Sequence, residues 1–162
     1  MKKLVYLISP NKIDQNFFTS LDKVLSFKNV KFFQLRLKNL SQKKLLNFSK
    51  RIIKITSKHK VKFIINDNFI LASKIKVDGC HIGQLDGSFK IARKKLKGKI
   101  LGITCHNSKI LANKAIKNKA DYIAFGSFFK SRLKPYAKKA NLNILNWAKK
   151  KYKKTNYSYW RY

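Results

Sequence analysis

Short apolar runs alternate along this chain with longer segments in which apolar residues recur at helical spacing. Six of these runs have the length and composition of strands: 4–8, 32–37, 62–65, 79–82, 100–104 and 122–125. Strands separated by helical segments are typical of a parallel sheet whose neighbouring strands are joined by crossover helices. The pattern therefore predicts an α/β fold with about six strand-helix units.

Three helices carry the clearest signals. Ser41 can cap the first, whose apolar residues are spaced three and four apart: Leu45, Phe48, Ile52 and Ile55. Ser108 can cap the second, whose apolar residues are Leu111, Ala115 and Ile116. The third lies near the end of the sequence and has as its apolar residues Leu142, Leu145, Ala148 and Tyr152.

Two architectures fit this order of elements: an open doubly wound sheet, or a (β/α)₈ barrel that is incomplete. At 162 residues and 44% hydrophobic content the chain can bury one sizeable core, which favours a single domain. Both architectures place their chemistry at the carboxyl ends of the strands. Polar residues follow or close most of the apolar runs, so we expect a functional site at that end.

The second apolar run contains polar residues in strict alternation. Gln34, Arg36 and Lys38 fall on one face of the strand, and the apolar residues between them fall on the other. In a barrel the helices cover the outside, so the polar face points inward, where two cations require an anion such as a diphosphate. The alternative is the solvated face of an exposed edge strand.

Carboxylates are scarce, with six Asp and no Glu against 39 Lys and Arg. Two of the six come shortly after predicted strands. Asp67 follows Asn66 at the end of the third apolar run, and Asp86 lies a few residues beyond the fourth. One or two carboxylates together with substrate phosphates are a common way to bind Mg²⁺. The alternative is that Asn66 and Asp67 form a turn or cap a helix that starts near Asn68.

A net charge of +33 suggests a nucleic-acid or anionic-membrane partner. The charge is mostly Lys and is spread over the whole chain together with Ile, Asn, Phe and Tyr, which indicates a genome rich in A and T rather than a dedicated nucleic-acid surface. Cys80 and Cys105 are too few for a disulfide framework, and each is followed by a His that points to the opposite strand face, which argues against zinc. No apolar stretch reaches the roughly 20 residues of a membrane span, so we expect a cytoplasmic, soluble protein.

Five ordered blocks resemble the thiamine-phosphate synthase family of the TenI superfamily: QLRLK at 34–38, IND at 65–67, DGCHIGQLD at 78–86, LGITCH at 101–106 and ADYIAFG at 120–126. The resemblance implies a (β/α)₈ barrel that joins hydroxymethylpyrimidine diphosphate to a thiazole phosphate, releases diphosphate and forms thiamine phosphate. Catalysis then depends on stabilising the leaving diphosphate and needs no protein nucleophile.

The resemblance also implies roles for individual residues. The expected ligands of the pyrimidine diphosphate are Gln34, Arg36, Lys38 and Asn66, and the expected ligands of Mg²⁺ are Asp67 and Asp86. Thr104 stands where the family has a substrate-binding serine. In the loop after the sixth strand, Lys134 is expected to contact the diphosphate and Ser131 the thiazole phosphate, whereas Leu133 replaces a threonine. The residues expected to assist departure of the diphosphate are Arg36, Lys38 and Lys134.

The family continues with two more strands after the helix near 142–153. We therefore expect a barrel domain at 1–154 that lacks the last two strands, an aberrant aromatic tail at 155–162, and weak or no catalysis. Alternatives are a non-catalytic protein that binds the pyrimidine diphosphate and Mg²⁺, a thiazole tautomerase-like protein, and a basic nucleic-acid-binding module. The sequence does not indicate an oligomeric state.

Overall fold

Seven parallel strands form a single curled sheet in this chain. The computed structural model describes residues 4–38, 40–129, 139–152 and 158–161, the last four by their backbone. The strands lie in the order of the sequence: β1 (Val5–Ile8), β2 (Val30–Leu35), β3 (Lys62–Asn66), β4 (Gly79–Ile82), β5 (Ile100–His106), β6 (Tyr122–Phe125) and β7 (Ser158–Arg161). Each strand pairs in parallel with the next one along the chain.

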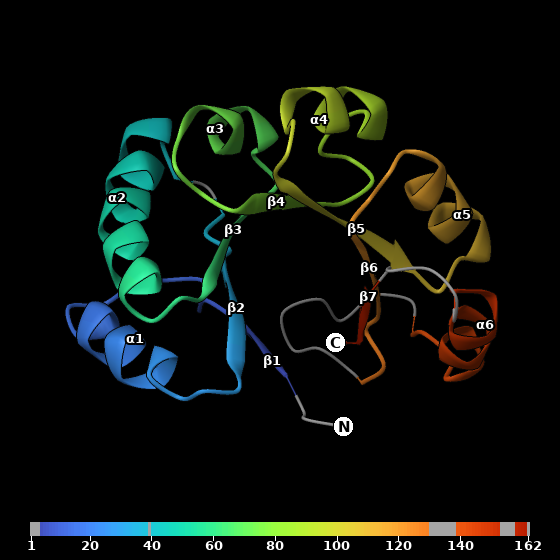
Figure 1. Ribbon diagram of the computed structural model, residues 1–162, viewed down its shortest axis with the longest axis horizontal. Coiled ribbons are helices and arrows are strands. Elements are labelled where there is room, and N and C mark those ends of the chain that lie inside the picture. The colour runs from blue at the N-terminus through green and yellow to red at the C-terminus, as the bar shows by residue number, and fades with distance from the viewer. Residues whose placement is uncertain (1–3, 39, 130–138, 153–157, 162) are drawn as a thin grey trace.

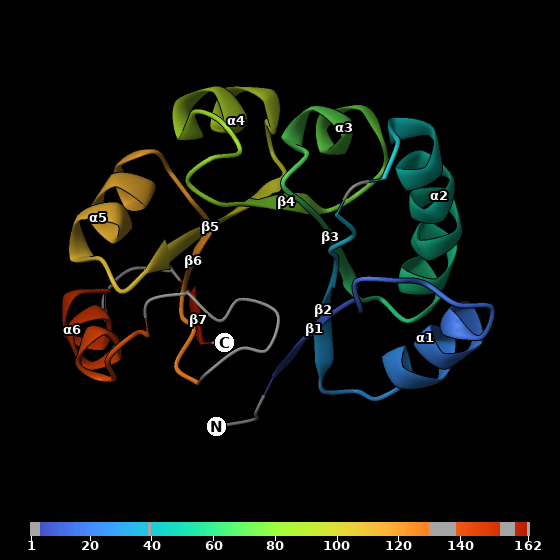
Figure 2. The same cartoon turned by 180° about the vertical axis from the view of Figure 1, so that it is seen from behind.

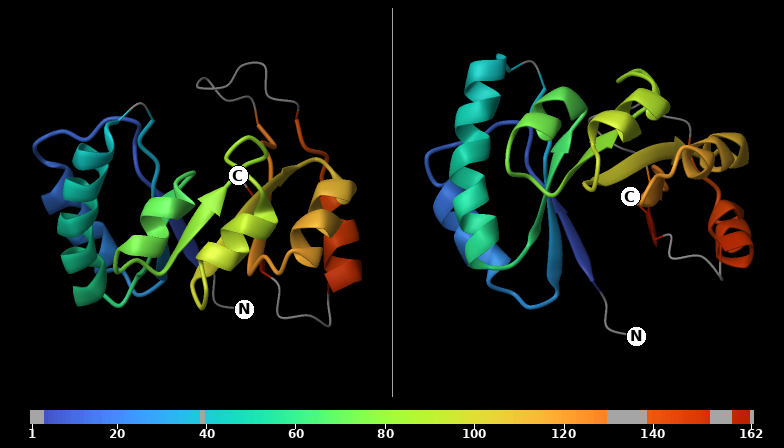
Figure 3. Two further views of the ribbon diagram at one scale, coloured as in Figure 1. Left: turned by 90° about the horizontal axis from the view of Figure 1, so that it is seen from above. Right: turned by 45° about the horizontal axis from the view of Figure 1, so that its top comes forward.

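The helices form an outer layer around this sheet (Figure 1). They are α1 (Phe17–Leu25), α2 (Gln42–Lys58), α3 (Phe69–Lys74), α4 (Phe89–Lys95), α5 (Lys109–Lys117) and α6 (Asn143–Tyr152). They lie on the convex side of the curl in Figures 1 and 2, and stay on the periphery in the tilted views of Figure 3. A sequential strand order with helices on one side distinguishes a barrel from a doubly wound sheet. The predicted incomplete (β/α) barrel is therefore confirmed.

Most predicted strand positions agree with the structure, and the differences lie at the ends. β2 ends at Leu35, so Arg36 and Lys38 follow the strand instead of closing it. The backbone N–H of Arg36 donates to Ser9 Oγ at 2.8 Å, which takes it out of the ladder. The structure also contains two short helices without a sequence prediction, α1 and α4.

The residues Ser158–Arg161 form β7, although the sequence analysis placed no strand there. They pair with β6 in the register Tyr122↔Ser158 to Phe125↔Arg161. The unpaired edge of a parallel sheet exposes backbone donors and acceptors. A segment rich in aromatic residues has high β propensity and can satisfy those groups.

The main core lies between the outer face of the sheet and the helices. Large side chains alternate outward from the strands and are fully buried, among them Phe33, Phe63, Ile82 and Ile103. The helices oppose them with small residues that are completely buried: Ala72, Ala92, Ala112, Ala115 and Ala148. Small residues let a helix approach the sheet closely, and each large side chain contributes roughly 1.5–3 kcal/mol by its burial.

Inside the curl, an aromatic cluster fills the lower part of the barrel. It consists of Tyr6, Phe32 and Tyr122, with ring centroids of Tyr6 lying 5.4 Å from Phe32 and 5.7 Å from Tyr122. Gly102 makes room for it, because a Cβ at that position would lie 2.0 Å from Cζ of Tyr122. The aromatic cluster therefore closes the interior from below, and free space remains above it.

Two aspartates organise the amino end of the sheet. Asp78 Oδ2 accepts from the backbone N–H of Phe63 at 2.9 Å, and Asp121 Oδ2 accepts from the backbone N–H of Leu101 at 2.7 Å. Each carboxylate thus caps the backbone of the preceding strand in the sheet. Both lie at the end of the sheet opposite to Asp67 and Asp86.

Candidate functional site

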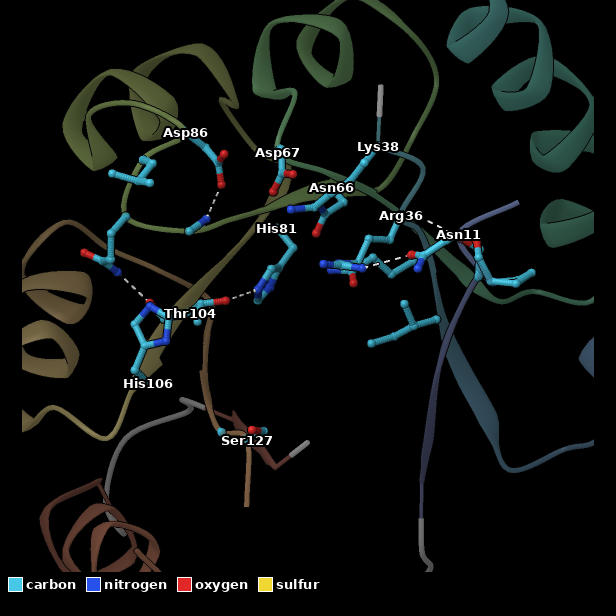
Figure 4. A pocket seen from close by; sticks show the side chains of 18 residues that line it. Asn11, Arg36, Lys38, Asn66, Asp67, His81, Asp86, Thr104, His106 and Ser127 are labelled. Atoms are coloured by element: carbon cyan, nitrogen blue, oxygen red, sulfur yellow. Dashed lines mark hydrogen bonds between the residues drawn. The ribbon is translucent and has the colours of Figure 1, made fainter. Parts of the chain in front are cut away.

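A cavity of about 510 Å³ opens at the carboxyl ends of the strands, above the aromatic cluster (Figure 4). Its size falls in the range of small-molecule sites. All the predicted site residues that the structure describes line it: Gln34, Arg36, Lys38, Asn66, Asp67, Asp86 and Thr104. Ser131 and Lys134 lie outside the described residues, and their predicted roles stay predictions.

One wall of the cavity carries cations and amides. Gln34 is almost completely buried at 1% exposure, and its Nε2 finds no hydrogen-bond partner among the described residues. Arg36 Nη1 donates to Asn11 Oδ1 at 3.2 Å, which holds the guanidinium in place. Lys38 is exposed at the mouth. This wall therefore offers one buried amide donor and two positive charges to a bound molecule.

The next two strand ends, those of β3 and β4, carry the two carboxylates. Asp67 has a positive φ of 65°, and its backbone N–H donates to the carbonyl of His81 at 2.7 Å, so the chain turns sharply at the end of β3. Asn68, and not Asp67, caps α3: its Oδ1 accepts from Leu71 N–H at 2.8 Å. The helix-cap alternative therefore does not apply to Asp67, whose carboxyl group faces the cavity (Figure 4).

Asp86 is held beside Asp67 by the loop after β4. Its Oδ2 accepts from the backbone N–H of Gly83 at 2.6 Å, and a Cβ on Gly83 would lie 3.1 Å from the same oxygen. Burial, followed by the neighbouring Asp86 carboxyl group, raises the pKa of Asp67 to about 6, while Lys38 and Arg36 act in the opposite direction. Two partly buried carboxyl groups that share a site disfavour their own ionisation, and a cation between them removes that cost.

The donor set fits a hard divalent cation better than zinc. Within the described part of the chain, no group of three or more His, Cys, Asp and Glu side chains could hold a metal ion. Cys80 and Cys105 are completely buried and do not line the cavity, so neither is a ligand there. Asp67 and Asp86 supply two oxygen ligands and leave room for the oxygens of a bound phosphate, which is the usual arrangement for Mg²⁺.

His81 is a site residue that the sequence analysis did not single out. It lies at the floor of the cavity with 3% exposure, and its Nε2 is 2.7 Å from Thr104 Oγ1. Its Nδ1 is 2.9 Å from the hydroxyl of Tyr122, whose hydroxyl is in turn 2.6 Å from that of Tyr6. Side chains alternate between the two faces of a strand, so Cys80 and His81 point to opposite faces and His81 points into the barrel. This alternation is the feature of the sequence that could have identified His81 as a site residue.

Other unpredicted residues come from loops at the same end of the sheet. Ser9 and Asn11 follow β1 and bind Arg36, as described above. Gln84 donates from Nε2 to the carbonyl of Thr104 at 2.6 Å and so ties the loop after β4 to β5. His106 and Ser127 also line the cavity. His106 ends β5 and the others follow strand ends, positions that mark a barrel site in general but do not specify a role.

Cations, amides and a carboxylate pair at the carboxyl ends of parallel strands are features of a phosphate-handling (β/α)-barrel enzyme. The sequence profile of thiamine monophosphate synthases matches residues 5–157, and the chain belongs to this family. The prediction of a transferase of thiamine biosynthesis is confirmed.

Relatives and a solved structure agree with this assignment. The thiamine-phosphate synthase of Pelagibacter ubique is 54% identical over 150 residues, which are 92% of this chain and 72% of that protein. The one from Erythrobacter litoralis is 38% identical over 148 residues, 88% and 70% of the two chains. A thiamine phosphate pyrophosphorylase from Pyrococcus furiosus superposes with a TM-score of 0.80 at 23% identity, covering 99% of this chain and 74% of its own, which supports the fold.

No helix in the described ranges is both long enough and apolar enough to cross a membrane.

Proposed function

We propose that this chain joins hydroxymethylpyrimidine diphosphate to thiazole phosphate and forms thiamine phosphate and diphosphate. The observation that carries the proposal is that one cavity is lined both by two cations, Arg36 and Lys38, and by two carboxylates, Asp67 and Asp86. A diphosphate with a divalent cation requires both kinds of partner at once.

Amide groups are proposed to bind the pyrimidine. Gln34 presents a buried Nε2 donor that has no partner among the described residues, and a ring nitrogen of the pyrimidine can accept its hydrogen bond. Asn66 lines the cavity from the end of β3 and offers a second amide. Binding would satisfy a polar group whose desolvation costs about 1–3 kcal/mol in the empty site, which favours this ligand over a purely apolar one.

In the proposed reaction the bond between the pyrimidine methylene carbon and the diphosphate oxygen breaks, and its electron pair leaves with the diphosphate. Arg36 and Lys38 stabilise the negative charge that develops there. The lone pair of the thiazole nitrogen then forms the new carbon–nitrogen bond to the methylene carbon. No side chain has to act as a nucleophile.

Mg²⁺ bound by Asp67 and Asp86 would supply further stabilisation of the departing diphosphate. Lys134 and Ser131 are proposed to contact the diphosphate and the thiazole phosphate, respectively. We also propose that the protein acts in the reducing cytoplasm, since Cys80 and Cys105 are free and buried.

The test is thiamine phosphate formation by the purified chain with both substrates and Mg²⁺. We expect weak turnover, and a loss of at least about 100-fold in kcat/KM for Arg36→Ala or Asp67→Asn. Lys90→Ala is the matched control, because it removes an exposed charge from α4, outside the cavity.

Three results would contradict the proposal. Calorimetric binding of the pyrimidine diphosphate without turnover identifies a binding protein. Thiazole isomerisation without diphosphate release identifies a tautomerase. Steeply salt-dependent binding to any DNA duplex, again without turnover, identifies a basic nucleic-acid module.

A further inference from the structure

A chain of buried and partly buried hydrogen bonds leads from the inside of the barrel to the cavity wall. It runs from the Tyr6 hydroxyl to the Tyr122 hydroxyl, on to Nδ1 of His81, and from Nε2 of His81 to Oγ1 of Thr104. The three links measure 2.6, 2.9 and 2.7 Å. They connect strands β1, β6, β4 and β5, so residues far apart in the sequence determine how the Thr104 hydroxyl is held.

The side chain of His81 is buried at 3% exposure, and each of its two ring nitrogens lies within hydrogen-bond distance of a hydroxyl group. A hydroxyl can donate to one nitrogen and accept from the other, so this geometry fits a neutral imidazole. A neutral imidazole has one nitrogen that donates and one that accepts. Of Nδ1 and Nε2, one must therefore donate a hydrogen bond and the other must accept one. If Nδ1 accepts from its partner, Nε2 donates to Thr104.

The partner at Nδ1 is a phenol, with a pKa near 10 in its unperturbed state, and a phenol is a stronger acid than the N–H of neutral imidazole. Donation from the Tyr122 hydroxyl to Nδ1 is therefore favoured over the reverse. The proton of His81 then resides on Nε2, and it is donated to Oγ1 of Thr104. The Thr104 hydroxyl hydrogen is consequently free to point away from His81, toward the cavity that Thr104 lines.

We propose that His81 is a positioning residue that presents the Thr104 hydroxyl to the cavity as a hydrogen-bond donor, with Tyr122 selecting the required tautomer. A donor suits an anionic substrate in a cavity that already carries Arg36 and Lys38. The opposite tautomer would turn the Thr104 hydrogen toward His81 and leave only an oxygen lone pair facing that substrate. The inference rests on the proposed function, but its first test does not need the reaction.

The first test is ¹⁵N NMR of the histidine rings in the substrate-free, full-length chain at neutral pH. We expect His81 with a protonated Nε2 and an unprotonated Nδ1, and a weakened preference for this tautomer in Tyr122→Phe. Tyr152→Phe is the matched control: it deletes the hydroxyl that donates to Asn113 Oδ1 between α6 and α5, away from the cavity. A protonated Nδ1 with an unprotonated Nε2 in the wild-type chain would overturn the inference even if the chain is a synthase.

The second test replaces the imidazole by amides that reproduce one nitrogen each. His81→Gln can place an N–H donor near the position of Nε2, and His81→Asn near that of Nδ1. We expect His81→Gln to retain kcat within about fivefold and His81→Asn to lose roughly tenfold or more, the worth of a hydrogen bond to a charged group. Circular dichroism and thermal melting establish that both variants are folded.

A double-mutant cycle separates positioning from a merely structural role. In a Thr104→Val background the His81→Asn change should cause no further loss, because the hydroxyl through which His81 acts is gone. Where turnover is too slow to measure, calorimetric affinity for inorganic diphosphate with Mg²⁺ is the readout. Equal losses in His81→Gln and His81→Asn, or an unchanged His81→Asn loss in the Thr104→Val background, would refute the inference.

Discussion

The carboxyl groups of Asp67 and Asp86 share one side of the cavity, and the pKa of Asp67 rises to about 6 as a result of burial and of this neighbour. The two groups come from loops after adjacent strands, β3 and β4. The backbone N–H of Asp67 donates to the carbonyl of His81 on β4, and the carboxyl group of Asp86 accepts from the backbone N–H of Gly83. A cation bound at this position would lower the cost of ionising Asp67.

The first prediction concerns the stability of the metal-free protein. The folded pKa of Asp67 lies above its ordinary value of 3.8, so its favourable contribution is complete below pH 4 and is lost as the pH rises through 6. Asp67→Asn should therefore melt higher than the wild-type chain at pH 7.5 in the presence of a chelator. We expect the melting temperature of Asp67→Asn to be about 2–4 °C higher, a small increase because the Asp67 side chain is only half-buried. The difference should shrink toward pH 4.5.

Asp14→Asn is the matched control for this experiment, since it makes the same change at an exposed aspartate outside the cavity. Its melting temperature should follow that of the wild-type chain at every pH. A lower melting temperature for Asp67→Asn than for wild type at pH 7.5 would show that Asp67 stabilises the metal-free fold, contrary to our prediction.

The second prediction concerns Mg²⁺. Because a ligand that binds only the folded state stabilises it, millimolar Mg²⁺ should raise the melting temperature of the wild-type chain at pH 7.5. The increase should be absent in both Asp67→Asn and Asp86→Asn. An equal increase in these variants would place the cation elsewhere.

The third prediction is that replacing Gln34 raises the stability of the protein and lowers its affinity for the substrate. Gln34→Met keeps the volume of the side chain but removes the buried amide, whose Nε2 has no hydrogen-bond partner in the part of the chain that the structure describes. We expect the free energy of unfolding, measured in urea, to rise by about 1 kcal/mol, because an unsatisfied buried donor is eliminated. Affinity for the pyrimidine diphosphate should fall at least about tenfold in calorimetry. A variant that loses stability and keeps its affinity would exclude the amide as a ligand.

The fourth prediction concerns Gly102. Gly102→Ala places a Cβ 2.0 Å from Cζ of Tyr122, so the tyrosine ring must move. We expect a loss of about 1–3 kcal/mol in the free energy of unfolding and a changed near-ultraviolet tyrosine signal. Combining it with Tyr122→Leu, which shortens the side chain, should recover part of that loss. An unchanged free energy in Gly102→Ala would mean that the aromatic cluster is loosely packed.

The fifth prediction concerns the start of α5. Ser108 Oγ accepts from the backbone N–H of Leu111 at 3.2 Å, and Ser108→Ala removes this cap. We expect the free energy of unfolding to fall by about 1 kcal/mol. Ser57→Ala, at an exposed position within α2, should cause no loss and serves as the control for the chemical change alone.

Local patterns predicted much of this fold from the sequence. The bounds of β4 and β6 match the predicted apolar runs, and Ser41 and Ser108 cap the helices that they were predicted to cap. These features depend on side-chain period and on contacts three residues apart, which a sequence displays directly.

Features that depend on distant partners could not be predicted in the same way. Alternation continued through Arg36, yet β2 stops at Leu35 because the hydroxyl of Ser9, 27 residues away, takes the backbone N–H. His81 looked like half of a Cys-His pair, and its place in the site follows from partners 23 and 41 residues away. In contrast, the position of Gln34, Asp67 and Asp86 in one cavity was predictable, because the carboxyl ends of all strands in a parallel barrel lie at the same face.

The sequential strand order has a consequence for how the chain reaches its native state. Each strand pairs only with its neighbours in the sequence, and the predicted site residues from Gln34 to Thr104 belong to the consecutive strand ends of β2 to β5. Contacts between consecutive units close shorter loops than contacts between distant units, so they carry a smaller entropic cost. The strand ends from β2 to β5 therefore form one contiguous part of the sheet, and Ser9 and Asn11 after β1 complete the cavity through their contacts with Arg36.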